Sequence, residues 1–155
     1  MLKIFIVRDS VLLCVLGLGP MSFATAEKNS TCSPDMANRA DSFLLKPDVS
    51  WSQLSQHQIT EGACDDGYFA EGYSDLVVRL FATRWKDFNA FVAVARTRPE
   101  FYSWVIRHID ETTSPDDLHR VISNASSCRK DPTLGRFCRD ISRAAERALD
   151  RTLSR

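Results

Sequence analysis

Residues 67–85 read GYFAEGYSDLVVRLFATRW and carry the strongest helical pattern in the chain. The apolar side chains recur every three or four residues, at Phe69, Tyr73, Leu76, Val77, Leu80, Phe81 and Trp85, and Val78 widens the apolar arc. A helix that is apolar over so much of its circumference packs against neighbours on two sides. Gly72 in its interior costs up to about 1 kcal/mol relative to alanine, which indicates the close approach of another backbone.

Shorter helices are predicted on both sides of this segment. Upstream, Ser33-Pro34-Asp35 begins a helix to about Leu45, and Ser50 begins a second from Trp51 to Gln58. Downstream, one helix is expected over residues 86–95, and another begins at Pro99 with a periodic pattern that continues through Thr112. Two more helices are expected to begin at Ser114-Pro115-Asp116-Asp117 and at Asp131-Pro132. No segment alternates with a period of two, and no motif repeats at a fixed interval. The chain is therefore predicted to be all-α, a compact, disulfide-stabilised array of about six or seven antiparallel helices.

The first 26 residues have the features of a cleavable secretory signal peptide. Lys3 and Arg8 supply the positive charge, residues 11–18 form a short apolar run, and Ala24-Thr25-Ala26 fits a cleavage site. The run is too short to span a membrane, and Pro20 interrupts it. Cleavage would leave residues 27–155 as a single helical domain in the periplasm. This mature chain of 129 residues has 18 basic and 19 acidic side chains.

Four cysteines remain after cleavage, because Cys14 lies in the predicted leader. An even number in an exported chain indicates disulfides. Of the three possible connectivities, the local one, Cys32–Cys64 with Cys128–Cys138, is favoured because Cys128 and Cys138 flank a predicted turn between helices. A zinc site is the competing interpretation, but the chain has no Cys-x-x-Cys pair and no well-spaced histidine. We expect no metal and no cofactor.

Composition narrows the class of function. The chain is 44% hydrophobic and 26% charged, which is ordinary for a folded protein. It has 20 basic and 20 acidic residues, whereas a nucleic-acid-binding protein would be basic. We expect neither a nucleic-acid partner nor membrane attachment after cleavage. A homodimer is compatible with the sequence.

Carboxylates are concentrated in the segment from Cys64 to Asp75. One interpretation is an acidic surface for a basic partner, and its candidate binding residues are Asp66, Glu71, Asp75, Asp110, Asp116 and Asp117. The local alternative is that Asp65 and Asp66 cap the central helix while Asp75 pairs with Arg79 one turn later.

His108 lies in line with the apolar residues Phe101, Trp104 and Val105. A histidine in such a position is most often a core residue that is hydrogen-bonded to a carboxylate or to the backbone. The chain has no nucleophile elbow, phosphate loop or His-Glu-x-x-His motif, so we predict no catalytic residues. The alternative is a small periplasmic enzyme or ligand carrier that uses Glu71, Asp75 or His108 in a pocket.

Cys64-Asp65-Asp66-Gly67 through Glu71-Gly72-Tyr73-Ser74-Asp75, with Arg107-His108-Ile109-Asp110, is similar to a pattern of exported proteins that marks no known active site. The signal peptide, the paired cysteines and the helical pattern together resemble the architecture of small periplasmic immunity proteins. Those proteins neutralise type VI secretion amidase effectors by blocking the active-site cleft of a cell-wall hydrolase. The resemblance implies a periplasmic protein-binding module and an inhibitor, and it assigns no functional residue.

Overall fold

The computed structural model describes residues 31–154, which contain α-helices, two short 3-10 helices and no strands. The helices are α1 (Pro34–Leu44), α2 (Trp51–Glu61), α3 (Gly67–Thr83), α4 (Phe88–Thr97), α5 (Pro99–Arg107), α6 (Pro115–Ser126) and α7 (Gly135–Leu153). The 3-10 helices are η1 (Gly62–Cys64) and η2 (Trp85–Asp87). The all-α fold and the predicted number of helices are confirmed over this part of the chain. The leader predicted for residues 1–26 lies outside it.

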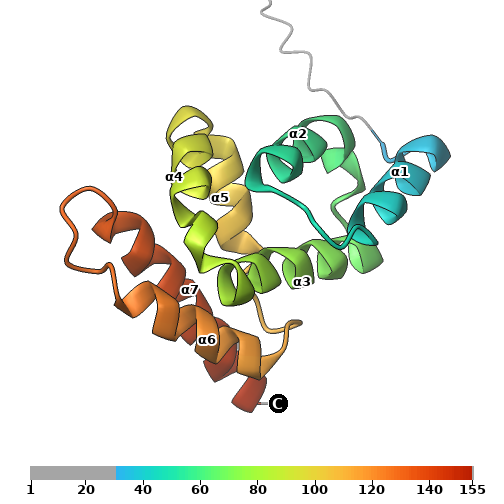
Figure 1. Ribbon diagram of the computed structural model, residues 1–155. Helices are drawn as coiled ribbons and strands as arrows, with labels where there is room; N and C mark the ends of the chain where they lie inside the picture. Colours follow the sequence, from blue (N-terminus) through green and yellow to red (C-terminus); the bar gives the residue numbers. More distant parts are fainter. Residues whose placement is uncertain (1–30, 155) are drawn as a thin grey trace, which may run out of the picture.

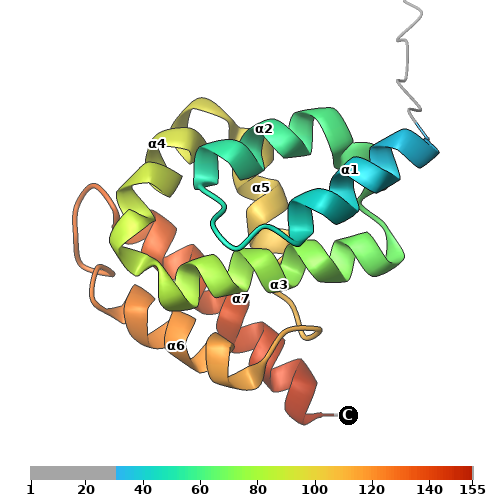
Figure 2. The same ribbon diagram turned by 45° about the vertical axis from the view of Figure 1, so that its right-hand side comes forward.

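Helix α3 crosses the middle of the molecule (Figures 1 and 2). Both views show α1 and α2 on one side of it and the hairpin of α6 and α7 on the other. The buried side chains of α3 come from both flanks: Tyr73, Ser74, Leu76, Val77, Val78, Leu80 and Phe81. The prediction of a central helix with two sets of neighbours is confirmed.

An aromatic cluster joins α2, α3 and α4 in the core. The ring of Trp51 lies 4.6 Å from that of Phe81 and 4.8 Å from that of Phe91, measured between centroids. Phe81 and Phe91 meet edge to face at 5.0 Å. Such pairs add about 0.5–1.5 kcal/mol each to the burial of their apolar area.

Local sequence signals set most helix starts. The Ser33 hydroxyl accepts a hydrogen bond from the Met36 N–H, and Ser50 forms a capping box with Gln53. Asp66 caps α3 by accepting from the Gly67 N–H at 2.8 Å. Ser114 precedes α6 as predicted, but its side chain makes no capping hydrogen bond.

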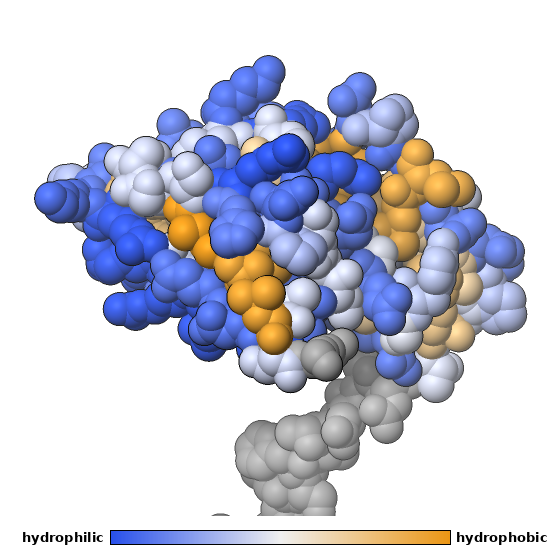
Figure 3. All heavy atoms as spheres, turned by 90° about the horizontal axis from the view of Figure 1, so that it is seen from below, coloured by the Kyte–Doolittle hydropathy of each residue, from blue (hydrophilic) through white to orange (hydrophobic). Residues whose placement is uncertain are grey.

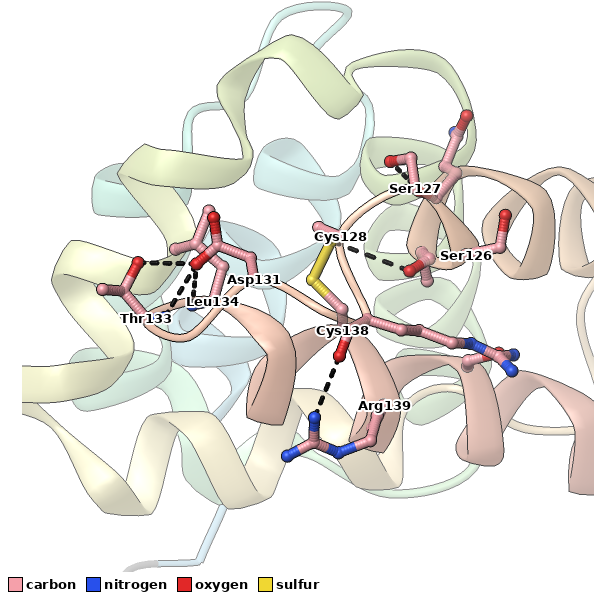
Figure 4. The surroundings of a disulfide bond; sticks show 12 residues. Ser126, Ser127, Cys128, Asp131, Thr133, Leu134, Cys138 and Arg139 are labelled. Carbon is pink, nitrogen blue, oxygen red and sulfur yellow. Dashed lines mark hydrogen bonds between the residues drawn. A yellow bond between two sulfur atoms is a disulfide. The ribbon is translucent and has the colours of Figure 1, made fainter.

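Of the helix boundaries that differ from the sequence prediction, two lie where aspartates form turns. Helix α5 ends at Arg107, and the Asp110 carboxylate then accepts from the Thr112 N–H at 2.9 Å. Helix α7 begins at Gly135, because Asp131 holds a preceding turn by accepting from the N–H groups of Thr133 and Leu134 (Figure 4).

Both predicted disulfides are present, with the local connectivity. Cys32–Cys64 joins the segment before α1 to η1, and Cys128–Cys138 joins the end of the α6 region to the first turn of α7 (Figure 4). Paired cysteines of this kind indicate an oxidising compartment outside the cytosol. None of the helices between residues 31 and 154 combines the length and the apolar character needed to cross a bilayer.

Two glycines lie at close approaches. A Cβ on Gly72 would lie 2.6 Å from Cδ1 of Leu44, so a side chain of α1 packs there and the expected approach of another backbone is wrong. A Cβ on Gly135 would lie 2.7 Å from the backbone oxygen of Arg129. The close backbone contact therefore occurs at the start of α7.

Candidate functional site

The acids of α3 point outward. Glu71 and Asp75 are both exposed, and Asp75 pairs with Arg79 at 3.2 Å. Asp66 is exposed and is the N-cap of the helix. The predicted local roles of Asp66 and Asp75 are confirmed, while Glu71 makes no hydrogen bond or ion pair with the described residues.

The loop between α5 and α6 and the first turn of α6 hold the other candidate acids. Asp110 accepts a hydrogen bond of 2.7 Å from the Ser74 hydroxyl, which fastens this loop to the middle of α3. Asp116 is exposed, and Asp117 pairs with Arg120 at 3.0 Å. The structure thus brings the acids of the loop and of α6 onto elements that adjoin α3, and the Asp110 carboxylate itself makes the contact with α3.

His108 lies at the centre of a buried polar network and is only 6% exposed. Its Nδ1 lies 3.0 Å from the Ser74 hydroxyl. Its Nε2 lies 3.1 Å from Oδ1 and 3.2 Å from Oδ2 of Asp65, and the hydrogen bond is directed to Oδ2. The Asp65 carboxylate also accepts from the indole N–H of Trp104 at 2.8 Å. The expected core histidine bonded to a carboxylate is confirmed.

The positions of these groups indicate what the network can do. His108 lies between Ser74 and Asp65, with one ring nitrogen within hydrogen-bonding distance of each. The Ser74 hydroxyl also contacts Asp110 and is only 1% exposed, so a substrate cannot reach it. The network joins the turn before α3 to α3 and α5.

Asp65 does not cap α3, contrary to the sequence prediction. Burial raises the pKa of its carboxyl, but the hydrogen bonds from His108 and Trp104 outweigh burial and hold the pKa below its ordinary value. This aspartate belongs to the interior, whereas its neighbour Asp66 caps the helix.

His57 is a second buried histidine, on α2. Its ring stacks on Phe43 with centroids 3.8 Å apart, and its Nε2 lies 3.0 Å from the Tyr73 hydroxyl. Burial lowers the pKa of His57 and raises that of Tyr73. Nearby, Arg39 makes two hydrogen bonds of 2.7 and 3.1 Å to the buried Glu61.

A groove of about 370 Å³ lies between α5 and α7. Its lining residues are Tyr102, Ser103, Ile106, Arg107, Asp140, Arg143 and Arg147. None of them was predicted as a site from the sequence. A signal was present, because Arg139, Arg143, Arg147 and Arg151 recur every four residues and so share one helix face.

Viewed from the side on which α6 and α7 lie in Figure 1, the surface is mostly hydrophilic, and its hydrophobic atoms form a narrow stripe and a group near one edge (Figure 3). Within residues 31–154, no three histidine, cysteine or acidic side chains are grouped so that they could hold a metal ion.

Comparisons with protein-family models, with curated proteins and with solved structures found no match.

Proposed function

We propose that this protein is a periplasmic protein-binding module whose contact face combines the outer side of α3 with the α5–α6 loop and the first turn of α6. The supporting observation is the hydrogen bond between Ser74 and Asp110, which holds the loop against α3. Together with the buried His108 network, this contact presents exposed acids on a fixed framework. Such preorganisation reduces the ordering cost of association.

The geometry favours a protein-binding function over the alternative of a small enzyme or ligand carrier. That alternative needs Glu71, Asp75 or His108 to converge on a pocket. Glu71 and Asp75 instead face outward, while His108 is buried with both ring nitrogens engaged. None of the three lines the groove between α5 and α7.

The proposed partner is a basic exported hydrolase of the cell wall, and the protein would act as its immunity protein. Enzymes that act on an anionic wall polymer are often basic, so an acidic face would speed their association. The disulfides fit an oxidising compartment, and the leader predicted for residues 1–26 would direct the chain to the periplasm.

The test uses the mature chain to capture proteins from a periplasmic extract of cells that express the hydrolase effector. Binding kinetics with the captured protein are then measured at two salt concentrations. Support requires that the captured protein is a basic wall hydrolase and that binding inhibits it. Glu71→Lys should slow association, and Glu71→Lys with Asp75→Lys should slow it further and flatten its salt dependence, because rim charges act mainly on the association rate.

Asp48→Lys is the matched control, since Asp48 is also exposed and lies between α1 and α2. It should leave the association rate near that of the unmodified chain. An association rate unchanged by the α3 variants would show that this acidic face makes no contact. Recovery of no protein partner would contradict the proposed function as a whole.

A further inference from the structure

The groove between α5 and α7 stands out when the contacts of the arginines are compared. Arg107 comes from the last turn of α5, while Arg143 and Arg147 lie one turn apart on α7. All three are exposed and line the same groove. None of them donates a hydrogen bond or forms an ion pair with residues 31–154.

Every other arginine in the described part of the chain has such a contact. Most pair with a carboxylate, as Arg39, Arg79, Arg84, Arg98, Arg120, Arg129, Arg136 and Arg151 do. Arg96 and Arg139 donate to backbone oxygens. The arginines without a contact are therefore concentrated at one concave place rather than scattered over the surface.

This concentration is unfavourable without a counter-ion. Like charges four residues apart on a helix destabilise it modestly, and Arg107 adds a third positive charge from the facing helix. The single carboxylate in the groove is Asp140, which accepts a hydrogen bond of 2.6 Å from the Tyr102 hydroxyl. Among the lining residues, three guanidinium groups thus accompany one carboxylate, while Asp65 and Glu146 act on Arg107 and Arg143 from outside the groove.

The groove also offers apolar surface. Ile106 and Tyr102 are half-buried members of its lining, and both pack against the core. The exposed Ser103 adds a hydroxyl. Its volume of about 370 Å³ lies within the range of small-molecule sites, about 300–1,000 Å³.

We infer that this groove binds a small organic oxyanion, with a phosphate or carboxylate group held by the arginines and a compact apolar part held against Ile106 and Tyr102. Guanidinium groups match both oxyanions, because their planar N–H donors can bind two oxygens at once. The inference is independent of the proposed protein partner, since it concerns a different part of the surface.

Calorimetric titration of the mature chain with phenyl phosphate, benzoate and inorganic phosphate tests the inference. Phenyl phosphate or benzoate should bind saturably, and comparison of the two identifies the preferred head group. Replacing Arg143→Gln and Arg147→Gln together should weaken that binding about tenfold or more, since each removes charge-assisted hydrogen bonds. Raising the salt concentration should weaken it as well.

Arg79→Gln with Arg120→Gln is the matched control, because it removes two surface arginines of α3 and α6 and should cost little stability. This variant should retain the affinity of the unmodified chain. The inference is overturned if neither aromatic probe binds, or if the control loses binding as strongly as the groove variant. Equal affinity for inorganic phosphate and phenyl phosphate would overturn the apolar part of the site.

Discussion

Asp65 and Asp66 are neighbours of the same residue type with different surroundings. Asp66 is exposed and caps α3, whereas Asp65 turns inward to His108 and Trp104. A local pattern predicts the cap because the required N–H group is adjacent in sequence. The inward role depends on α5, about 40 residues further on, and no local pattern contains it.

Replacing Asp65→Asn should lower the free energy of unfolding by about 2 kcal/mol at pH 7, because charge-assisted hydrogen bonds of this kind are lost. The folded-state pKa of Asp65 is lowered. The ionised carboxylate therefore contributes fully to the free energy of unfolding above the ordinary aspartate pKa of about 3.9. That contribution is lost as the pH falls through the folded-state pKa, and the difference between the two proteins should then shrink.

Denaturant unfolding at pH 7 and at about pH 3 measures this difference. The control is Asp66→Asn, which should change stability little since asparagine is an equally good N-cap. Equal effects of the two substitutions would show that Asp65 has no special role.

The two tightly packed glycines should respond differently to alanine. At Gly72 the added methyl group meets the end of the Leu44 side chain, which can move, while at Gly135 it meets the backbone oxygen of Arg129. Gly135→Ala should therefore cost more than Gly72→Ala, about 1–3 kcal/mol. Gly72→Leu should also destabilise, by more than the gain in helix propensity of about 1 kcal/mol offsets. Thermal melts rank the three variants, and a neutral Gly135→Ala would contradict the close backbone contact.

At the scale of the helices, starts were easier to predict than ends. Ser33, Ser50 and Asp66 act on N–H groups within three residues, so the sequence contains both partners. The apolar periodicity after Pro99 continues past the end of α5, because Ile109 remains buried in a turn. Burial alone therefore cannot distinguish the last helical residue from a packed loop residue.

His57 joins three helices through Phe43 of α1 and Tyr73 of α3, and this contact should make stability depend on pH. Burial lowers the pKa of His57 in the folded state. The unfolded chain therefore takes up a proton near pH 6.5 that the folded protein binds only at lower pH. Stability should fall as the pH drops below about 6.5 and stop falling below the folded-state pKa.

Replacing His57→Gln should flatten the dependence of the melting temperature on pH between about 7 and 5. His119→Gln is the matched control, because His119 is an exposed histidine of α6. If both variants keep the slope of the unmodified chain, His57 does not couple folding to protonation.

At the scale of the whole molecule, the disulfides close loops of different length. Their sequence separations are 32 for Cys32–Cys64 and 10 for Cys128–Cys138. A chain-entropy model then gives about 4 and about 3 kcal/mol respectively. Serine replacement of the first pair should therefore lower the melting temperature more than replacement of the second.

Thiol titration of the denatured, unreduced mature chain should find no free thiol, and two or more would contradict the pairing.

The sequence by itself determined the helical class, the central place of α3, the pairing of the cysteines and the capping roles of Ser33, Ser50 and Asp66. The helical class, the central helix and the caps depend on apolar periodicity or on groups a few residues apart. The cysteine pairing follows from an even number of cysteines with Cys128 and Cys138 only 10 residues apart. Only the tertiary structure decided that Asp65 and Ser74 bind His108, that His57 is buried, and that Arg107 joins Arg143 and Arg147 at one groove. Each of these contacts joins helices whose residues lie tens of positions apart, and their distances depend on how the helices pack around α3.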